Sequence, residues 1–404
     1  MIVSSVVRRV AAGAGVLPLL LLSSPAAAAD RPVEPVPPPA AAPIDRALLY
    51  RPGTLVRLPP GVPAPPRVSA RAWLVADART GDVLAAHDAH RPLPPASTLK
   101  ALFALTALPR LAPPTLHTVS GHELEGIGDG SSLVGVQENV TYRLDDLWNG
   151  VFLSSGNDAV RVLAGLNGGW AQTARQMQAT ARALGAHDTR VVSPDGYDAP
   201  GQVSSAYDLA VFGRAGLHDP DFAHYCAKPY AKFPARGWTY SIRNTNRLVT
   251  GANGVSRYPG ILGIKNGYTS SAGHTLIAAA RQGRHTLVVT VLNPRRGGAY
   301  AVYEEARDLF DWGFAAAGRV RPVGSLLPPA PRARPVAVPA GPASRTVPPS
   351  ATAAPSAPAG PVKASGAAAA DDGPGVVLPV TFVASACLAA ATMWLVRRRG
   401  GLPG

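Results

Sequence analysis

Strand-forming segments occur at both ends of the foldable part of the chain, and helix-forming segments lie between them. Apolar runs at 72–77 and 83–86 flank turn residues and predict a hairpin. Alternating β-rich segments at 274–281 and 285–292 predict two adjacent antiparallel strands. The order hairpin, helices, hairpin and closing helix predicts an α/β (α+β sandwich) fold. In this fold one antiparallel sheet is assembled from both ends of the domain and flanked by helices, with a helical subdomain inserted.

Composition divides the 404 residues into six segments. A basic start, a short apolar core and small residues indicate a signal for export. Stretches rich in proline and alanine cannot bury a core and are expected to be extended. A late apolar run has membrane-spanning length and is followed by arginines, which stay cytoplasmic. The predicted segments are a signal peptide (1–29), a Pro-rich leader (30–66), a folded domain (67–320), a Pro/Ala-rich stalk (321–375), a transmembrane helix (376–396) and a basic tail (397–404).

Ser97 and Lys100 form an S-x-x-K motif in front of an apolar run at 101–105. Residues three apart share one face of a helix, so the hydroxyl and the amine can touch. Serine becomes a strong nucleophile when a base takes its proton, and lysine can be that base when burial lowers its pKa. The motif alone also fits a helix-capping serine followed by a solvated lysine. The chain has only five lysines, however, and two related motifs follow in order, Ser155-Gly156-Asn157 and Lys265-Asn266-Gly267.

The formal charge of +14 is carried almost wholly by arginine. Such an excess is compatible with attraction to an anionic cell envelope, and equally with a GC-rich genome that favours arginine codons. The sequence has no dense basic run with interleaved aromatic residues, so no nucleic-acid partner is expected. The nine histidines and two cysteines show no metal-ligand spacing, so we expect neither a metal nor another cofactor.

The three motifs resemble the S-x-x-K, S-x-N and K-T-G set of penicillin-interacting serine enzymes. The chain is similar to the low-molecular-mass penicillin-binding proteins, specifically the serine-type D-alanyl-D-alanine carboxypeptidases of peptidase family S11. The similarity extends over roughly residues 68–318, including the segments 74–81, 193–196, 205–210 and 244–248. It implies a β-lactamase/penicillin-binding-protein-like fold and a serine D,D-peptidase domain at 67–320.

The resemblance also implies a role for each matching residue. Ser97 would attack the carbonyl between the last two D-alanines, Lys100 would accept its proton, and Ser155 would pass that proton to the leaving amine. Backbone N–H groups would form the oxyanion hole. Lys265 would place positive charge near the terminal carboxylate and keep Lys100 neutral. The implied substrate-binding residues are Asn157, Lys265, Asn266, Gly267, Tyr268 and Thr269.

Asn266 departs from the family pattern, in which threonine follows the lysine of the third motif. An asparagine amide can donate to the same substrate carboxylate, but it is longer and reaches differently. Thr269 could supply a hydroxyl if its side chain faces the substrate. No E-x-x-L-N-like segment follows Ser155, which disfavours a class A β-lactamase.

The motifs therefore leave three interpretations open. The first is an exported carboxypeptidase, anchored by its C-terminal helix to the outer face of the cytoplasmic membrane. It would trim peptidoglycan stem peptides ending in D-Ala-D-Ala, with β-lactams as acylating inhibitors. The second is a D,D-transpeptidase, in which an amine replaces water as the acyl acceptor. The third, motivated by Asn266, is a module that binds wall peptide or penicillin without turnover.

Overall fold

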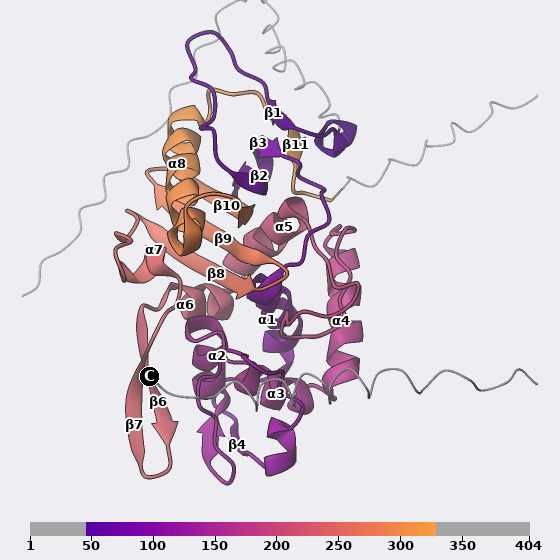
Figure 1. The fold of residues 1–404 in the computed structure, drawn as a ribbon, viewed down its shortest axis with the longest axis vertical. Coiled ribbons are helices and arrows are strands. Elements are labelled where there is room, and N and C mark those ends of the chain that lie inside the picture. Colours follow the sequence, from indigo (N-terminus) through magenta and orange to yellow (C-terminus); the bar gives the residue numbers. More distant parts are fainter. Residues whose placement is uncertain (1–45, 329–404) are drawn as a thin grey trace, which may run out of the picture. The chain divides into compact units, whose positions relative to one another are not determined.

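The computed structural model describes residues 46–328 (Figure 1). The predicted signal peptide, the first part of the leader, most of the stalk, the predicted membrane helix and the basic tail lie outside the described residues. Between residues 46 and 328, no helix is both long enough and apolar enough to cross a membrane.

A seven-stranded antiparallel sheet forms the centre of the domain. The strand order is β1-β3-β2-β10-β9-β8, with β11 beside β3. The N-terminal hairpin joins the C-terminal strands through β2 and β10, where Val75 pairs with Val289. This pairing confirms that the sheet is assembled from both ends of the domain. The strands are β1 (Thr54–Val56), β2 (Ala70–Asp77), β3 (Asp82–His87), β8 (Ile261–Thr269), β9 (Gly273–Gln282), β10 (His285–Pro294) and β11 (Gly324–Ser325).

Helices cover both faces of this sheet (Figure 1). Helix α8 (Ala301–Ala316) packs on one face, where Phe310 joins the apolar cluster that contains Val289. Helix α5 (Ala206–Leu217) packs on the other face, where Phe212 joins a second cluster with Val288. The central strands are buried on both faces, which explains their nearly continuous apolar sequences.

A mainly helical region connects β3 to β8, as the sequence predicts. It also contains two two-stranded antiparallel sheets that the sequence pattern did not predict, the pair β4–β5 and the hairpin β6–β7. Their strands are short and largely exposed, so they lack a strong alternating pattern. The elements are η2 (Ala96–Leu99), α1 (Lys100–Ala107), η3 (Leu108–Arg110), β4 (Leu116–Thr118), η4 (Gly121–Leu124), β5 (Thr141–Arg143), α2 (Leu144–Leu153), α3 (Asn157–Leu166), α4 (Trp170–Ala183), α6 (Pro220–Ala227), β6 (Tyr230–Ala235), β7 (Trp238–Arg243) and α7 (Arg247–Thr250).

The predicted limits of the folded domain, 67 and 320, are too narrow. Helix η1 (Arg46–Tyr50) and strand β1 fall within the predicted leader, and strand β11 falls within the predicted stalk. Leu49 is buried, and β1 hydrogen-bonds to β3 along the sheet edge. Composition misses these elements because they contain only a few apolar residues between prolines. The strands β1 and β11 are stabilised by pairing with β3, which lies far away in the sequence.

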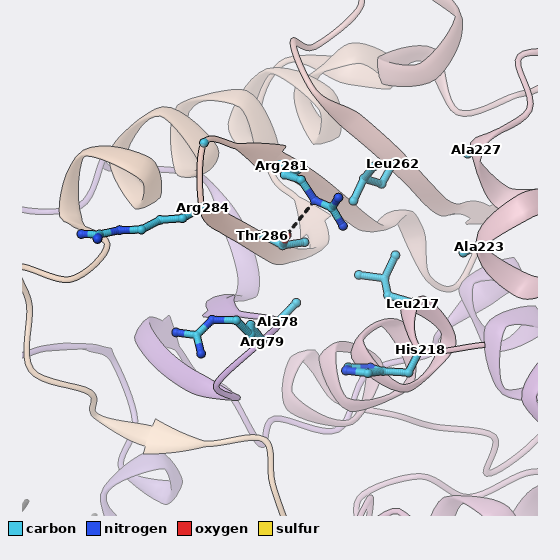
Figure 2. Close-up of a pocket in the computed structure, with 11 residues that line it drawn as sticks. Ala78, Arg79, Leu217, His218, Ala223, Ala227, Leu262, Arg281, Arg284 and Thr286 are labelled. Carbon is cyan, nitrogen blue, oxygen red and sulfur yellow. Dashed lines mark hydrogen bonds between the residues drawn. The ribbon is translucent and has the colours of Figure 1, made fainter. Parts of the chain in front are cut away.

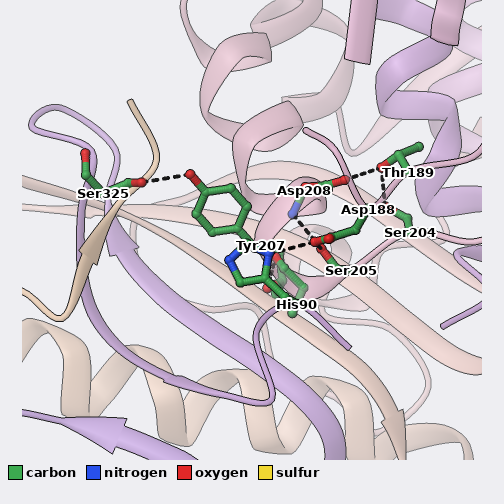
Figure 3. A network of polar contacts seen from close by, with 10 residues as sticks. His90, Asp188, Thr189, Ser204, Ser205, Tyr207, Asp208 and Ser325 are labelled. Atoms are coloured by element: carbon green, nitrogen blue, oxygen red, sulfur yellow. Dashed lines mark hydrogen bonds and ion pairs between the residues drawn. The ribbon is translucent and has the colours of Figure 1, made fainter. Parts of the chain in front are cut away.

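A buried polar network fixes the start of α5 to the segment before residue 190 (Figure 3). Ser205 caps α5 by accepting from the backbone N–H of Asp208 at 3.1 Å, and its Oγ donates to Asp188 Oδ2 at 2.6 Å. His90 Nδ1 lies 2.7 Å from the same Asp188 oxygen. Thr189 Oγ1 donates to Asp208 Oδ2 at 2.6 Å. Burial raises the pKa of the Asp208 carboxyl to about 7, and the nearby Asp188 charge adds to this rise.

The raised pKa of Asp208 predicts that the domain loses stability as pH rises from about 4 to about 7. In this window the folded state keeps the Asp208 proton, whereas the unfolded state, with the ordinary pKa of 3.8, has lost it. The unfolding free energy therefore falls with pH, by up to about 4 kcal/mol from this group. Asp208→Asn removes the titration and is expected to flatten the pH dependence measured by urea unfolding. The control is Asp221→Asn, at an exposed position. If Asp208→Asn left the pH dependence of the unfolding free energy unchanged, this would contradict a raised pKa for Asp208.

Candidate active site

Ser97 and Lys100 meet at the junction of η2 and α1. Lys100 Nζ donates to Ser97 Oγ at 2.8 Å and to the backbone oxygen of Asp195 at 2.6 Å. Ser97 lies in a 3₁₀ turn and Lys100 begins the α-helix. Side chains three apart eclipse each other in a 3₁₀ turn, which aligns the hydroxyl with the amine. The structure thus brings the predicted nucleophile and base into direct contact.

Both motif lysines are buried, each with only 1% of its surface exposed. Burial lowers the pKa of Lys100 to about 8, opposed by the negative charges of Asp195 and Asp158. Burial also lowers the pKa of Lys265 well below its ordinary value, and the charge of Lys100 lowers it further. Lys265 Nζ donates to the backbone oxygen of Asn266 at 2.8 Å. Burial therefore weakens the positive charge of both motif lysines in the free enzyme.

Strand β8 runs directly beside the Ser97 backbone. At Gly267 a Cβ atom would lie 2.7 Å from the Ser97 nitrogen and 2.7 Å from Thr275 Oγ1. Thr275, on β9, donates to the backbone oxygen of Pro95 at 2.9 Å. The third motif therefore needs glycine here so that its strand can approach the nucleophile, and the next strand fixes the turn in front of Ser97.

The turn before Ser97 has an uncommon backbone conformation. Ala96 has a φ of 50°, in the left-handed region that residues with side chains seldom adopt. Gly196 packs against it, and a Cβ there would lie 2.1 Å from the Ala96 carbonyl oxygen. Gly196 follows Asp195, whose carbonyl accepts from Lys100. The segment around 195–196 thus supports both the nucleophile's backbone and the base's amine.

The second motif lies in the turn between α2 and α3. Ser155 has a φ of 59°, and its buried Oγ has no hydrogen-bond partner among the described residues. Asn157 Nδ2 donates to Ser131 Oγ at 3.0 Å, while its buried Oδ1 has no partner among these residues. Asp158 accepts backbone N–H groups from 134–136 and fixes the neighbouring loop. The buried Ser155 Oγ and Asn157 Oδ1 thus keep unused hydrogen-bonding capacity, whereas the amine of Lys100 bonds to Ser97 and Asp195.

The remaining motif residues differ in how free they are to meet a substrate. Asn266 Oδ1 accepts from Thr245 Oγ1 at 3.0 Å, which leaves its amide nitrogen as the free donor. Tyr268 is 62% exposed, and its ring centroid lies 4.6 Å from that of His274. Thr269 Oγ1 donates to Asp198 Oδ1 at 2.7 Å. The Thr269 hydroxyl is therefore engaged in a turn and does not replace the missing threonine.

Two cavities lie beside these residues, one by the turn before Ser97 and one by the third motif. One, of about 310 Å³, is lined by Pro95, Gly196 and Asp198. Another, of about 350 Å³, is lined by Asn266, Gly267 and Tyr268. A larger cavity of about 540 Å³ lies by the hairpin between β9 and β10 (Figure 2), and none of the sequence-predicted site residues lines it.

Several residues that shape the site were not predicted from the sequence. Asp195 contributes a backbone oxygen, and only the match of its segment to the resembling family drew attention to it. Thr245 likewise lies in a segment that resembles the family, 244–248. The other unpredicted residues carry no local motif, because their partners come from distant elements. Within residues 46–328 no cluster of three or more His, Cys, Asp or Glu side chains could hold a metal ion. The unpredicted contributors are Ser131, Asp158, Thr245 and Thr275.

Relatives support the similarity inferred from the motifs. Residues 61–296 match the D-alanyl-D-alanine carboxypeptidase family, peptidase family S11. A D-alanyl-D-alanine carboxypeptidase of Mycobacterium tuberculosis is 38% identical over 260 residues, covering 64% of this chain and 86% of the relative. One from Salmonella typhimurium is 34% identical over 267 residues, covering 62% of this chain and 64% of the relative.

Solved structures show the same fold. The crystal structure of D-alanyl-D-alanine carboxypeptidase from M. tuberculosis is 37% identical, with a TM-score of 0.60, covering 66% of this chain and 99% of that one. Penicillin-binding protein 6B from Escherichia coli is 33% identical, with a TM-score of 0.56 and coverages of 64% and 81%. A Streptomyces DD-transpeptidase mutant, 24% identical with a TM-score of 0.57 and coverages of 62% and 99%, agrees in fold alone. The chain therefore belongs to the D-alanyl-D-alanine carboxypeptidase family, the serine-type peptidase family S11 of low-molecular-mass penicillin-binding proteins.

Proposed function

We propose that this carboxypeptidase is exported, anchored at the outer face of the cytoplasmic membrane by residues 376–396, and removes the terminal D-alanine from peptidoglycan stem peptides. The observation that carries the proposed chemistry is the 2.8 Å contact between the buried Lys100 amine and the Ser97 hydroxyl. Location and anchoring rest on the sequence pattern of the two terminal segments.

Acylation follows from this geometry. A neutral Lys100 takes the Ser97 proton while Ser97 Oγ bonds to the penultimate D-alanine carbonyl carbon. Backbone N–H groups of Ser97 and Tyr268 stabilise the resulting oxyanion. The C–N bond to the terminal D-alanine then breaks, and the proton passes from Lys100 through Ser155 to the leaving amine. Water hydrolyses the Ser97 ester and regenerates the free hydroxyl.

Substrate binding favours the active protonation state of the two lysines. A carboxylate beside Lys265 stabilises the protonated form of that amine. A charged Lys265 in turn disfavours a second charge on Lys100, because both amines are buried and like charges repel. The terminal carboxylate thus helps Lys265 to keep Lys100 neutral, which is the role expected for Lys265 from the sequence.

Mass spectrometry of the full-length chain tests the acyl-enzyme. Incubation with penicillin is expected to give one covalent adduct on Ser97, and a D-Ala-D-Ala-ended peptide is expected to release free D-alanine. Ser97→Ala should lose both products. An adduct without D-alanine release would favour a transpeptidase if an added amine is incorporated into product, and a binding module if it is not. Absence of any adduct would overturn the acyl-enzyme mechanism.

The lowered pKa of Lys100 predicts the pH dependence of acylation. Only the neutral amine is a base, so the second-order rate with penicillin should rise roughly tenfold per unit below about pH 8 and level off above it. Lys100→Arg keeps a permanent charge and should acylate at least about 100-fold more slowly. The matched control is Lys232→Arg, at an exposed position. A flat profile between pH 6 and 9 would exclude Lys100 as the base.

The substitution Gly267→Ala tests whether acylation requires the close approach of β8 to Ser97. The added methyl group would lie 2.7 Å from the Ser97 nitrogen, so the strand or the nucleophile must move. We expect acylation to slow by at least about tenfold, with a stability loss of about 1–3 kcal/mol. The control is Gly165→Ala, in which the new methyl group lies 3.7 Å from its nearest neighbour. Because this is an ordinary contact distance, acylation should be unchanged. Acylation at the normal rate in Gly267→Ala would show that this close approach is not required.

A further inference from the structure

The hollow beside the β9–β10 hairpin is separate from the active site and has a mixed lining (Figure 2). Its volume is about 540 Å³, which lies within the usual range for small-molecule sites. Three arginines and one histidine line it, and no acidic side chain of residues 46–328 does. The rest of the lining is mainly alanine and leucine. The basic members are Arg79, His218, Arg281 and Arg284.

The charge of the three arginines is not neutralised by neighbouring carboxylates. None of them forms an ion pair with an acidic side chain in the described part of the chain. Asp77 directly precedes the lining segment 78–79, but its Oδ1 accepts the backbone N–H groups of Arg79 and Thr80. Arginine stays protonated in proteins, so the hollow keeps a positive charge and favours an anionic ligand group.

Two of the arginines are held through one nitrogen and keep their other donors free. Arg281 Nε donates to Thr286 Oγ1 at 3.2 Å, and Arg284 Nε donates to His285 Nε2 at 3.4 Å. The terminal nitrogens of both guanidinium groups have no hydrogen-bond partner among residues 46–328. Two terminal nitrogens in one plane match a pair of oxygens on a phosphate or a carboxylate.

The apolar lining lies across the hollow from two of the arginines. In Figure 2, Leu217 and Leu262 lie on one side of the hollow, whereas Arg79 and Arg284 extend from the other side, with Arg281 between them. Both leucines are only partly buried, so a ligand can cover apolar surface here. Removing this surface from water is favourable. A ligand that satisfies both sides has an anionic head and an apolar tail.

We propose that this hollow binds an anionic phospholipid, with its phosphate ester against the arginines and the first carbons of its acyl chains against Leu217 and Leu262. A phosphate ester presents acceptor oxygens in several directions, so more than one guanidinium can bind it. Charge attraction and apolar burial together determine how strongly a protein binds an anionic lipid surface. Such binding orients the folded domain with the β9–β10 hairpin toward the membrane, which goes beyond the proposed peptidase activity.

Native mass spectrometry of the full-length chain in a non-ionic detergent measures the ligand preference. The probes are dihexanoyl phosphatidylglycerol, dihexanoyl phosphatidylcholine and glycerol 1-phosphate. Phosphatidylglycerol is expected to bind most tightly. Phosphatidylcholine should bind at least about tenfold more weakly, because its head group carries a compensating cation. Glycerol 1-phosphate should also bind at least about tenfold more weakly, because it has no acyl chains to bury.

Substitutions on the two sides of the hollow separate the two parts of the ligand. Arg281→Gln/Arg284→Gln should reduce the affinity for phosphatidylglycerol by roughly 10–100-fold and remove the preference over phosphatidylcholine. Leu217→Gln should weaken lipid binding but leave the affinity for glycerol 1-phosphate unchanged. The matched control is Arg295→Gln/Arg296→Gln, which removes the same charge from another, mainly basic hollow and should keep the preference.

Unchanged affinity for phosphatidylglycerol in Arg281→Gln/Arg284→Gln would overturn the inference, as would an equal loss of affinity in the control. Equally tight binding of glycerol 1-phosphate would identify a simple anion site and exclude the lipid. Release of D-alanine, measured on the same samples, should be retained in the three hollow substitutions and shows that these chains are folded. Failure of the unmodified chain to release D-alanine would overturn the proposed function and not the lipid site.

Discussion

Burial of the Lys100 and Lys265 side chains beside Ser97 is the constraint on which the rest of the domain depends. Two ammonium groups in one desolvated site are strongly disfavoured, so at least one amine must be neutral at ordinary pH. The N–H groups of the two amines need hydrogen-bond acceptors, and the backbone oxygens of Asp195 and Asn266 supply two of these acceptors. A buried amine without such partners would destabilise the fold, so the surrounding backbone must be held in position.

The sheet provides that rigidity. Lys100 begins a helix that follows the N-terminal hairpin, and Lys265 lies on a strand near the C-terminal end of the domain. Pairing of β2 with β10 joins these two regions into one sheet. The close approach at Gly267 and the bond from Thr275 to Pro95 then set the distance between strand and nucleophile. Catalytic geometry is therefore determined by long-range strand pairing more than by the local S-x-x-K spacing.

This dependence explains which features the sequence could predict. Strand-forming segments separated by turn residues predicted both hairpins of the sheet correctly, because both signals are local. The edge strand β1 was missed because it pairs with β3 farther along the chain. The hairpin β6–β7 was missed because its strands are largely exposed and lack a strong alternating pattern. The same difference holds in the site. Contact between Ser97 and Lys100 followed from spacing, whereas the hydroxyl of Thr269 is directed to Asp198, which no sequence pattern indicates.

The lowered pKa values of the two lysines were also beyond the sequence, and they have a consequence for the chemistry. A motif shows that two amines are close, but their relative burial and their acceptors decide which one keeps the proton. Here burial lowers the pKa of both amines, so an anion that stabilises a charge on Lys265 favours a neutral Lys100.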